Sequence, residues 1–184
     1  MRLFLATTFP PAVIAELNAR LTPVKPKLPA ASWVRAEAQH LTFAFLGEQE
    51  EALLERITAP LTATLSAIAT FQATLCGAGF FPNPRHARVG WVGLDPELPF
   101  VEIAGVVRDV VTRAGVKLDG GEFKPHLTLM RMRDRWPPAS IDTFQRALRD
   151  YRSAEFTMTA VTLYSSKLGP GGAVHTPLHE FALS

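Results

Sequence analysis

Apolar and polar residues alternate along the chain with two periodicities, one typical of strands and one typical of helices. Short apolar runs such as Arg2 to Thr7 and Val89 to Leu94 predict buried strands. The clearest helical repeat runs from Glu48 to Thr70, where leucine and isoleucine recur on one face, and Pro60 predicts a kink within it. The whole pattern gives the order β-α-β-α-β-β-α-β-α-β-β.

Turn residues separate these elements. The stretch GAGFFPNPR at 77–85 and the stretch GPGG at 169–172 are expected to be turns. The strand pair 71–75 and 89–94 is joined in a hairpin-like way, which favours antiparallel or mixed sheets. Because the order of elements is similar in the two halves, we expect an α+β fold in which residues 1–184 form a single domain of two related lobes.

Composition and charge narrow the class of protein. Of the 184 residues, 47% are hydrophobic and 20% charged, as in an ordinary globular protein. No apolar run approaches the roughly 18 residues that would span a bilayer, and the first residues lack the features of a secretory signal. The single cysteine, Cys76, excludes an internal disulfide and a cysteine-based zinc site. We therefore expect a cytoplasmic monomer without membrane association.

The net charge of +2 provides no global basic field that would hold a long duplex, so any contact with nucleic acid is expected to be local.

The tripeptide His-Leu-Thr occurs twice, in HLTFAFLG at 40–47 and in HLTLMRMR at 126–133. With five His, 22 Leu and 16 Thr in the chain, a random copy is expected roughly 0.05 times, so chance does not explain two. In a strand, the imidazole and the hydroxyl of each copy project on one face and the leucine on the other. Two such strands across a cleft would bring two imidazoles and two hydroxyls together.

This set of groups suits displacement at a phosphodiester. An imidazole titrates near pH 6.5, so one ring can act as a base towards water while the other protonates the leaving oxygen. Threonine hydroxyls can donate to the non-bridging phosphate oxygens as their charge increases. A metal site is a weaker alternative, because neither tripeptide carries a second histidine or a carboxylate at ligand spacing. No cofactor is required by this chemistry.

The chain resembles the two-histidine (2H) phosphoesterase superfamily and, within it, the bacterial and archaeal RNA 2′,3′-cyclic phosphodiesterases, also called 2′-5′ RNA ligases. The resemblance is carried by five stretches spread over nearly the whole chain: RLFLATTFP, SWVRAEAQHLTFAFLGE, GAGFFPNPRHARVGWVGL, FKPHLTLMR and TLYSSKLGPGG. It implies a bilobal α+β fold in which two pseudo-symmetric antiparallel sheets form a central cleft that holds both motifs, with helices on the outer faces.

The resemblance also implies roles for individual residues. His40 and His126 are expected to be the catalytic acid–base pair, and Thr42 and Thr128 to bind the phosphate. We assign His126 as the base on water and His40 as the acid on the leaving O3′, which would convert a 2′,3′-cyclic end into a 2′-phosphate. The substrate would be RNA with such ends or a small cyclic nucleotide.

Arg131 follows the second motif. Simple alternation does not put it on the face of His126, but a strand end or a bulge would direct it to the substrate phosphate, for which arginine is well shaped. The alternative is a solvated surface arginine.

Other polar and aromatic residues are further candidates for contact with the substrate. Four aromatic residues could stack a base, although each also suits core or loop packing: Phe9, Trp33, Phe45 and Phe81. Arg35 and Lys124 could steer a phosphate chain, although solvated charge is the commoner role. Surface or structural roles are expected for the remaining cations and histidines: Arg133, Arg135, His86, His175 and His179.

Two further functions stay open. The same groups could join a 2′,3′-cyclic end to a 5′-hydroxyl without ATP, because a ribose hydroxyl can replace water. The cleft could instead belong to an RNA- or nucleotide-binding module without turnover.

Overall fold

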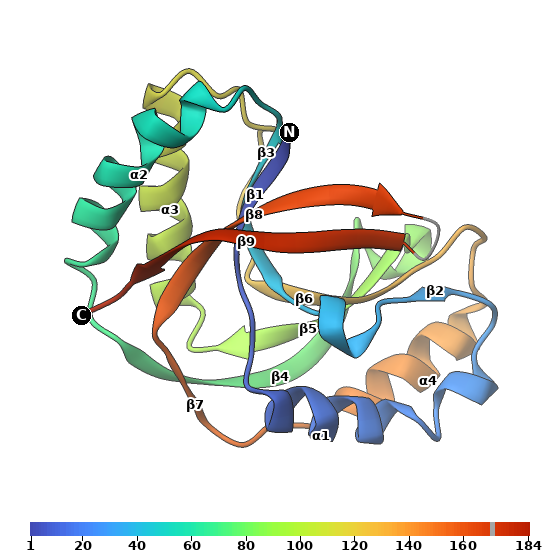
Figure 1. Cartoon of the computed structure of the whole chain (residues 1–184). Coiled ribbons are helices and arrows are strands. Elements are labelled where there is room, and N and C mark those ends of the chain that lie inside the picture. The colour runs from blue at the N-terminus through green and yellow to red at the C-terminus, as the bar shows by residue number, and fades with distance from the viewer. Residues whose placement is uncertain (170–171) are drawn as a thin grey trace.

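The computed structural model describes residues 1–169 and 172–184. Within them, the strands form two antiparallel sheets, with the orders β3-β1-β8-β9 and β2-β6-β5-β4-β7 (Figure 1). The first sheet consists of β1 (Arg2–Thr7), β3 (Leu41–Glu48), β8 (Ala160–Gly169) and β9 (Gly172–Ala182). The second consists of β2 (Ser32–Trp33), β4 (Phe71–Phe81), β5 (Val89–Asp95), β6 (His126–Arg131) and β7 (Phe156–Met158). The predicted α+β class and the two antiparallel sheets are confirmed.

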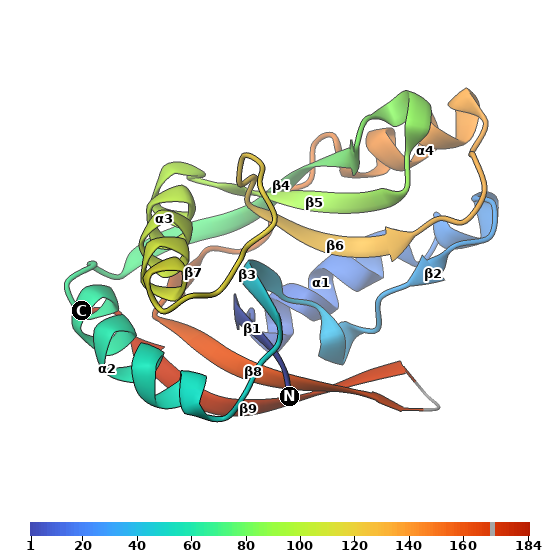
Figure 2. The same cartoon turned by 90° about the horizontal axis from the view of Figure 1, so that it is seen from above.

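The two halves of the chain repeat one unit of strand, helix and His-Leu-Thr strand. In the first half β1 is followed by α1 and, after the short β2, by β3, and β1 pairs with β3 antiparallel. In the second half β5 is followed by α3 and then by β6, and β5 pairs with β6 in the same way. The sheets are therefore pseudo-symmetric around the two motifs, and β3 and β6 lie against each other between them (Figure 2).

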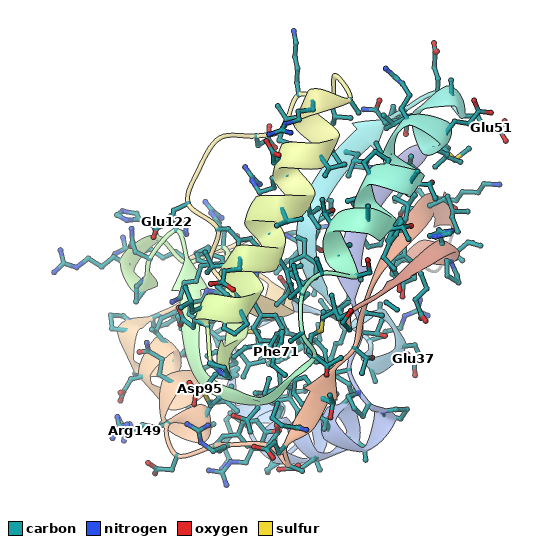
Figure 3. The ribbon with its side chains drawn as sticks, turned by 90° about the vertical axis from the view of Figure 1, so that its left-hand side faces the viewer. Glu37, Glu51, Phe71, Asp95, Glu122 and Arg149 are labelled. Carbon is teal, nitrogen blue, oxygen red and sulfur yellow. The ribbon has the colours of Figure 1, made fainter. Side chains whose placement is uncertain are left out.

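Helices cover the sheets in two pairs. They are α1 (Pro11–Leu21), α2 (Ala52–Leu65), α3 (Leu98–Arg113) and α4 (Pro138–Leu148). The pair α2 and α3 lie side by side, and they pack on β9 and β3 respectively (Figures 1 and 3). The pair α1 and α4 pack together beside β4. Each helix buries an apolar stripe, so a continuous hydrophobic core lies under both sheets.

Several predicted boundaries are wrong, and the largest error concerns β4. The stretch 77–85, expected to be a turn, instead continues β4 as far as Phe81. Gly77 is the extra residue of a bulge in the pairing with β5 and has φ +68, a conformation that glycine adopts without a Cβ penalty. Glycine here marks a bulge and a close contact rather than the end of the strand.

Other differences are smaller. The helix predicted over 48–70 is limited to α2, which contains Pro60. Pro170 and Gly171 of the expected GPGG turn lie outside the described residues. Among the described residues, none of the helices combines the length and apolar character needed to cross a membrane.

Candidate active site

His40 directly precedes β3 and His126 begins β6, so the two occupy equivalent positions in the repeated motif. The Nδ1 atom of His40 lies 2.7 Å from the carbonyl oxygen of Ala38, and that of His126 lies 2.7 Å from the carbonyl oxygen of Lys124. A carbonyl oxygen only accepts, so Nδ1 carries a proton in each ring and Nε2 is left to gain or lose one. Both rings therefore have the same fixed tautomer and present a titrating Nε2.

The backbone before His40 is held by a buried amide. Gln39 is 4% exposed, and its side chain donates to the carbonyl oxygen of Val34 at 3.2 Å. Its Oε1 accepts from Nδ2 of Asn18 at 3.0 Å. These bonds tie the residue preceding His40 to α1 and to the end of β2. Gln39 is a positioning residue that sequence periodicity does not reveal.

A bulge in each motif strand changes which side chains share the face of the histidine. Thr128 pairs with Trp91 and Met130 with Gly90, so Leu129 is an extra residue in β6. After this extra residue the alternation of side chains between the two faces of the sheet shifts by one. Arg131 therefore lies on the same face as His126 and Thr128. The bulge considered for Arg131 is thus present.

The first motif contains the equivalent bulge. Thr42 pairs with Ala6 and Ala44 with Leu5, which leaves Phe43 as the extra residue. Phe45 therefore shares the face of Thr42, at the position that corresponds to Arg131 in the second motif, and its side chain is 64% exposed. The pseudo-symmetric cleft thus carries an aromatic ring from one motif and a guanidinium from the other.

Aromatic rings surround His40. The ring of Phe4 lies 5.1 Å from that of His40, and the ring of His175, from β9, lies 5.3 Å away at an angle of 83°. The Nδ1 atom of His175 is buried and has no hydrogen-bond partner among the described residues. His175 was expected to be a surface or structural residue, but it is half-buried in the site. The signal that reveals it is the pairing of β8 with β9, which the sequence pattern does not provide.

His126 is held from the other sheet. Its ring lies 4.8 Å from that of Phe81, in an edge-to-face arrangement, and 6.3 Å from that of Trp91. The indole of Trp91 lies over Gly79, where an added Cβ would come within 2.2 Å of it. Gly79, in the stretch expected to be a turn, therefore makes room for the ring that supports His126.

Burial and positive charge both favour the neutral imidazoles. Burial is the largest influence and lowers the pKa of His40, against the bond to Ala38; the positive charges of His175, Arg131 and His126 lower it further. Burial also lowers the pKa of His126, against the bond to Lys124, and Arg131 and Lys124 add to the effect. Because the charge of Arg131 acts on both rings, the three side chains lie in one electrostatic environment.

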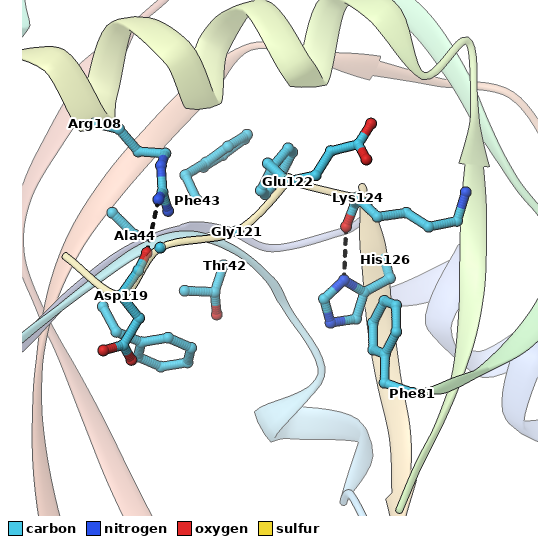
Figure 4. Close-up of a pocket in the computed structure, with 13 residues that line it drawn as sticks. Thr42, Phe43, Ala44, Phe81, Arg108, Asp119, Gly121, Glu122, Lys124 and His126 are labelled. Atoms are coloured by element: carbon cyan, nitrogen blue, oxygen red, sulfur yellow. Dashed lines mark hydrogen bonds between the residues drawn. The ribbon is translucent and has the colours of Figure 1, made fainter. Parts of the chain in front are cut away.

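A pocket of about 340 Å³ opens between the two motifs and includes Thr42 of the first and His126 of the second (Figure 4). Phe45 and Phe81 also line it, together with the segment from Asp119 to Lys124. Arg108 holds this segment by donating to the carbonyl oxygen of Asp119 at 2.9 Å. The pocket thus offers aromatic surface next to the imidazole and the hydroxyl of opposite sheets.

The remaining aromatic candidates divide by burial. Phe9 is 7% exposed and packs on Phe156 in the core, so it cannot stack a base. Trp33 is half-buried, and Nζ of Lys25 lies 4.7 Å from the centre of its ring. Of the four candidates, Phe45 and Phe81 line the pocket.

The other charged candidates differ in exposure and in their partners. Lys124, expected as a solvated charge, is half-buried and pairs with Glu97 at 3.2 Å. Arg35, Arg133 and Arg135 are exposed, as expected. The same is true of two other histidines, His86 and His179.

Comparisons with known proteins agree on the family. The family described as the 2′-5′ RNA ligase superfamily matches residues 9–170. A Thermus thermophilus protein named RNA 2′,3′-cyclic phosphodiesterase is 32% identical over 191 residues, covering 100% of this chain and 90% of its own. A protein of the same name from Archaeoglobus fulgidus is 31% identical and covers 98% of this chain and 99% of its own.

Solved structures agree with the sequences. A crystal structure of a Thermus thermophilus protein superposes with a TM-score of 0.80 at 31% identity, covering 99% of this chain and 97% of that one. Escherichia coli LigT, in a crystal structure described as complexed with 3′-AMP, superposes with a TM-score of 0.77 at 26% identity, covering 100% and 97%. The chain therefore belongs to the 2′-5′ RNA ligase superfamily of two-histidine phosphoesterases, and the resemblance in its sequence is confirmed.

Proposed function

We propose that the protein hydrolyses the 2′,3′-cyclic phosphate at the end of an RNA chain to a 2′-phosphate, with His40 and His126 as the acid–base pair. The observation that carries this proposal is the matched pair of imidazoles. Each has Nδ1 bonded to a backbone carbonyl at 2.7 Å, and each belongs to a His-Leu-Thr strand facing the other. Two rings with the same tautomer and a free Nε2 are what a double proton transfer requires.

In this mechanism water attacks phosphorus in line with the bond to O3′. Nε2 of His126 removes the proton from water as the new P–O bond forms. Nε2 of His40 gives its proton to O3′ as the P–O3′ bond breaks. The phosphate remains on O2′, and a proton has moved from His40 to the sugar while another has moved to His126. Exchange with water restores both rings.

Charge on the non-bridging oxygens increases in the transition state. Thr42 and Thr128 lie two residues after their histidines on the same face, so their hydroxyls can donate to these oxygens. Arg131, brought to this face by the bulge at Leu129, can add a bidentate charged contact. The three donors come from both sheets, and the phosphate would be clamped between them.

The relatives support the type of substrate. Proteins about 30% identical over nearly their full length are named RNA 2′,3′-cyclic phosphodiesterase. The similar structure of LigT is described as complexed with 3′-AMP, a nucleotide with its phosphate on the ribose. The pocket lined by Phe45 and Phe81 next to His126 offers aromatic surface on which a base could stack.

The name of the family favours a second activity for the same site. If the 5′-hydroxyl of another RNA replaces water, the same proton transfers join the ends through a 2′-5′ bond without ATP. Incubation with paired tRNA halves, followed by gel analysis, would reveal a joined product. We expect hydrolysis to dominate in dilute solution because water is present at far higher concentration.

For 2′,3′-cyclic AMP in EDTA, kcat/KM is expected to show a bell-shaped dependence on pH. The active form holds one proton shared between the two imidazoles, and kcat/KM reports the free enzyme. Since burial lowers the pKa of His40 and of His126, both rings become neutral as the pH rises past about 6.5 and the acid is lost. The maximum of kcat/KM should therefore lie below about pH 6.5. A maximum above about pH 8 would contradict this assignment of the pair.

A further inference from the structure

Cations gather where β6 ends. We call this surface the basic end, and it consists of the half-buried Lys25 and five exposed arginines: Arg35, Arg88, Arg131, Arg133 and Arg135. In residues 1–169 and 172–184 none of the six forms an ion pair with a carboxylate. The nearest carboxylates in sequence are Glu37 and Asp134. Six cations against these two carboxylates leave the basic end with an excess of four positive charges, in a chain whose net charge is only +2.

Backbone contacts place these residues together. Arg131 lies between Ser32 of β2 and Val89 of β5 (Figure 2). The guanidinium of Arg88 donates to the carbonyl oxygen of Arg133, and the amide of Met132 donates to the carbonyl oxygen of Arg88 at 2.9 Å.

Two further contacts bring the other cations to the same end. Lys25 lies over Trp33 in β2, next to Ser32. The indole N–H of Trp136, the residue after Arg135, donates to the carbonyl oxygen of Ala30 at 3.5 Å. The cations thus belong to three separate segments that meet at one end of the sheet.

The opposite end of β6 is different. There Lys124 pairs with Glu97 at 3.2 Å. Arg108 is engaged with the carbonyl oxygen of Asp119. A polyanion that leaves the cleft by this end meets Lys124 beside a carboxylate, whereas the six cations of the basic end, within the described part of the chain, have no carboxylate partner.

The basic end is continuous with the candidate active site. Arg131 belongs to both, and its charge acts on His40 and His126. Arg35 lies in the segment that leads from β2 to His40, and this segment is fixed by the bond from the amide of Val34 to the carbonyl oxygen of Leu129 at 2.9 Å. A chain of phosphates that begins at the imidazoles would therefore meet Arg131 before it reaches the other cations of the basic end.

We infer that the basic end binds the sugar–phosphate chain of a single-stranded RNA whose 2′,3′-cyclic terminus lies between the histidines. This inference rests on the proposed function. A 2′,3′-cyclic nucleotide at a 3′ terminus has only one neighbour, on its 5′ side, so the substrate needs a single route out of the cleft. Cations without carboxylate partners suit the regularly spaced phosphates of that route. The preferred substrate is then an oligonucleotide rather than a mononucleotide.

The test compares an RNA of about ten nucleotides carrying a 2′,3′-cyclic end with 2′,3′-cyclic AMP, using the variant Arg133→Glu/Arg135→Glu. Both residues lie outside the proposed acid–base and phosphate groups. We expect kcat/KM for the RNA to fall about tenfold at low salt, with kcat/KM for 2′,3′-cyclic AMP unchanged. The slope of log kcat/KM against log salt for the RNA should decrease in magnitude by about 1.4, since each phosphate contact on a single strand contributes about 0.7.

The matched control is Arg113→Glu/Lys117→Glu, which makes the same change in charge at two exposed residues outside the basic end. This control variant should have the wild-type kcat/KM for both substrates. Equal effects of Arg133→Glu/Arg135→Glu on the two substrates, or loss of RNA turnover in the control variant instead, would overturn the inference. If wild-type protein consumed neither substrate, the proposed function would be wrong. Fluorescence anisotropy with a 2′-phosphate-ended RNA would then still show whether the basic end binds RNA.

Discussion

Replacement of either His40 or His126 by alanine is expected to lower kcat/KM for a 2′,3′-cyclic nucleotide by about 10²–10⁴-fold, the usual contribution of one placed proton transfer. Each ring has its Nδ1 engaged with a carbonyl oxygen 2.7 Å away, so Nε2 is the atom available for the reaction. Alanine removes that atom and supplies nothing that could carry the proton. Steady-state rates measured by separating the cyclic and opened nucleotides would check this.

His86→Ala is the matched control, because His86 is exposed and lies outside the site. It should retain the wild-type rate. If His40→Ala and His126→Ala were as active as His86→Ala, with all three melting at similar temperatures, the acid–base pair would be wrongly assigned.

The two roles can be separated with a cyclic substrate that carries sulfur in place of O3′. A thiolate leaves without protonation, so this substrate does not need an acid. His40→Ala should therefore regain most of its activity on it, while His126→Ala should not. The reverse pattern would exchange the roles of acid and base.

Replacement of Thr42 or Thr128 by valine is expected to lower kcat about 10²–10³-fold each, as loss of one donor to a developing charge does. Valine keeps the shape of threonine and removes only the hydroxyl, so the strand pairing with Ala6 or with Trp91 should persist. Because the proposed contact strengthens in the transition state, kcat should fall more than KM rises.

Thr157→Val provides the control for this pair, since Thr157 lies on β7 and bonds to Gln72. Its kcat should equal that of the wild type. A change confined to KM in Thr42→Val and Thr128→Val would show that the hydroxyls bind the ground state only.

Much of the site could be predicted because the repeated tripeptide fixes residue types and spacing together. Strand alternation correctly puts His126 with Thr128 on one face and Leu127 on the other. What alternation could not predict is the bulge at Leu129, since a bulge depends on the pairing with β5 and has no periodic signal. For this reason the sequence alone leaves the direction of Arg131 open.

The third histidine was missed for a related reason. His175 has no motif around it, and its contact with His40 depends on the sheet order β3-β1-β8-β9, which brings distant segments together. The prediction for the stretch 77–85 was wrong for the opposite reason. Its local composition gives a clear turn signal, yet its first residues continue β4. There Gly79 is needed for the close approach of Trp91, a tertiary contact that overrides the local preference.

The most direct test of the paired histidines is phosphorus NMR of 2′,3′-cyclic AMP mixed with the protein in EDTA. Two imidazoles acting on opposite sides of one phosphorus should convert the cyclic signal entirely into that of the 2′-phosphate, without an added metal. Persistence of the cyclic signal, or a product phosphorylated on the 3′ oxygen, would contradict the account.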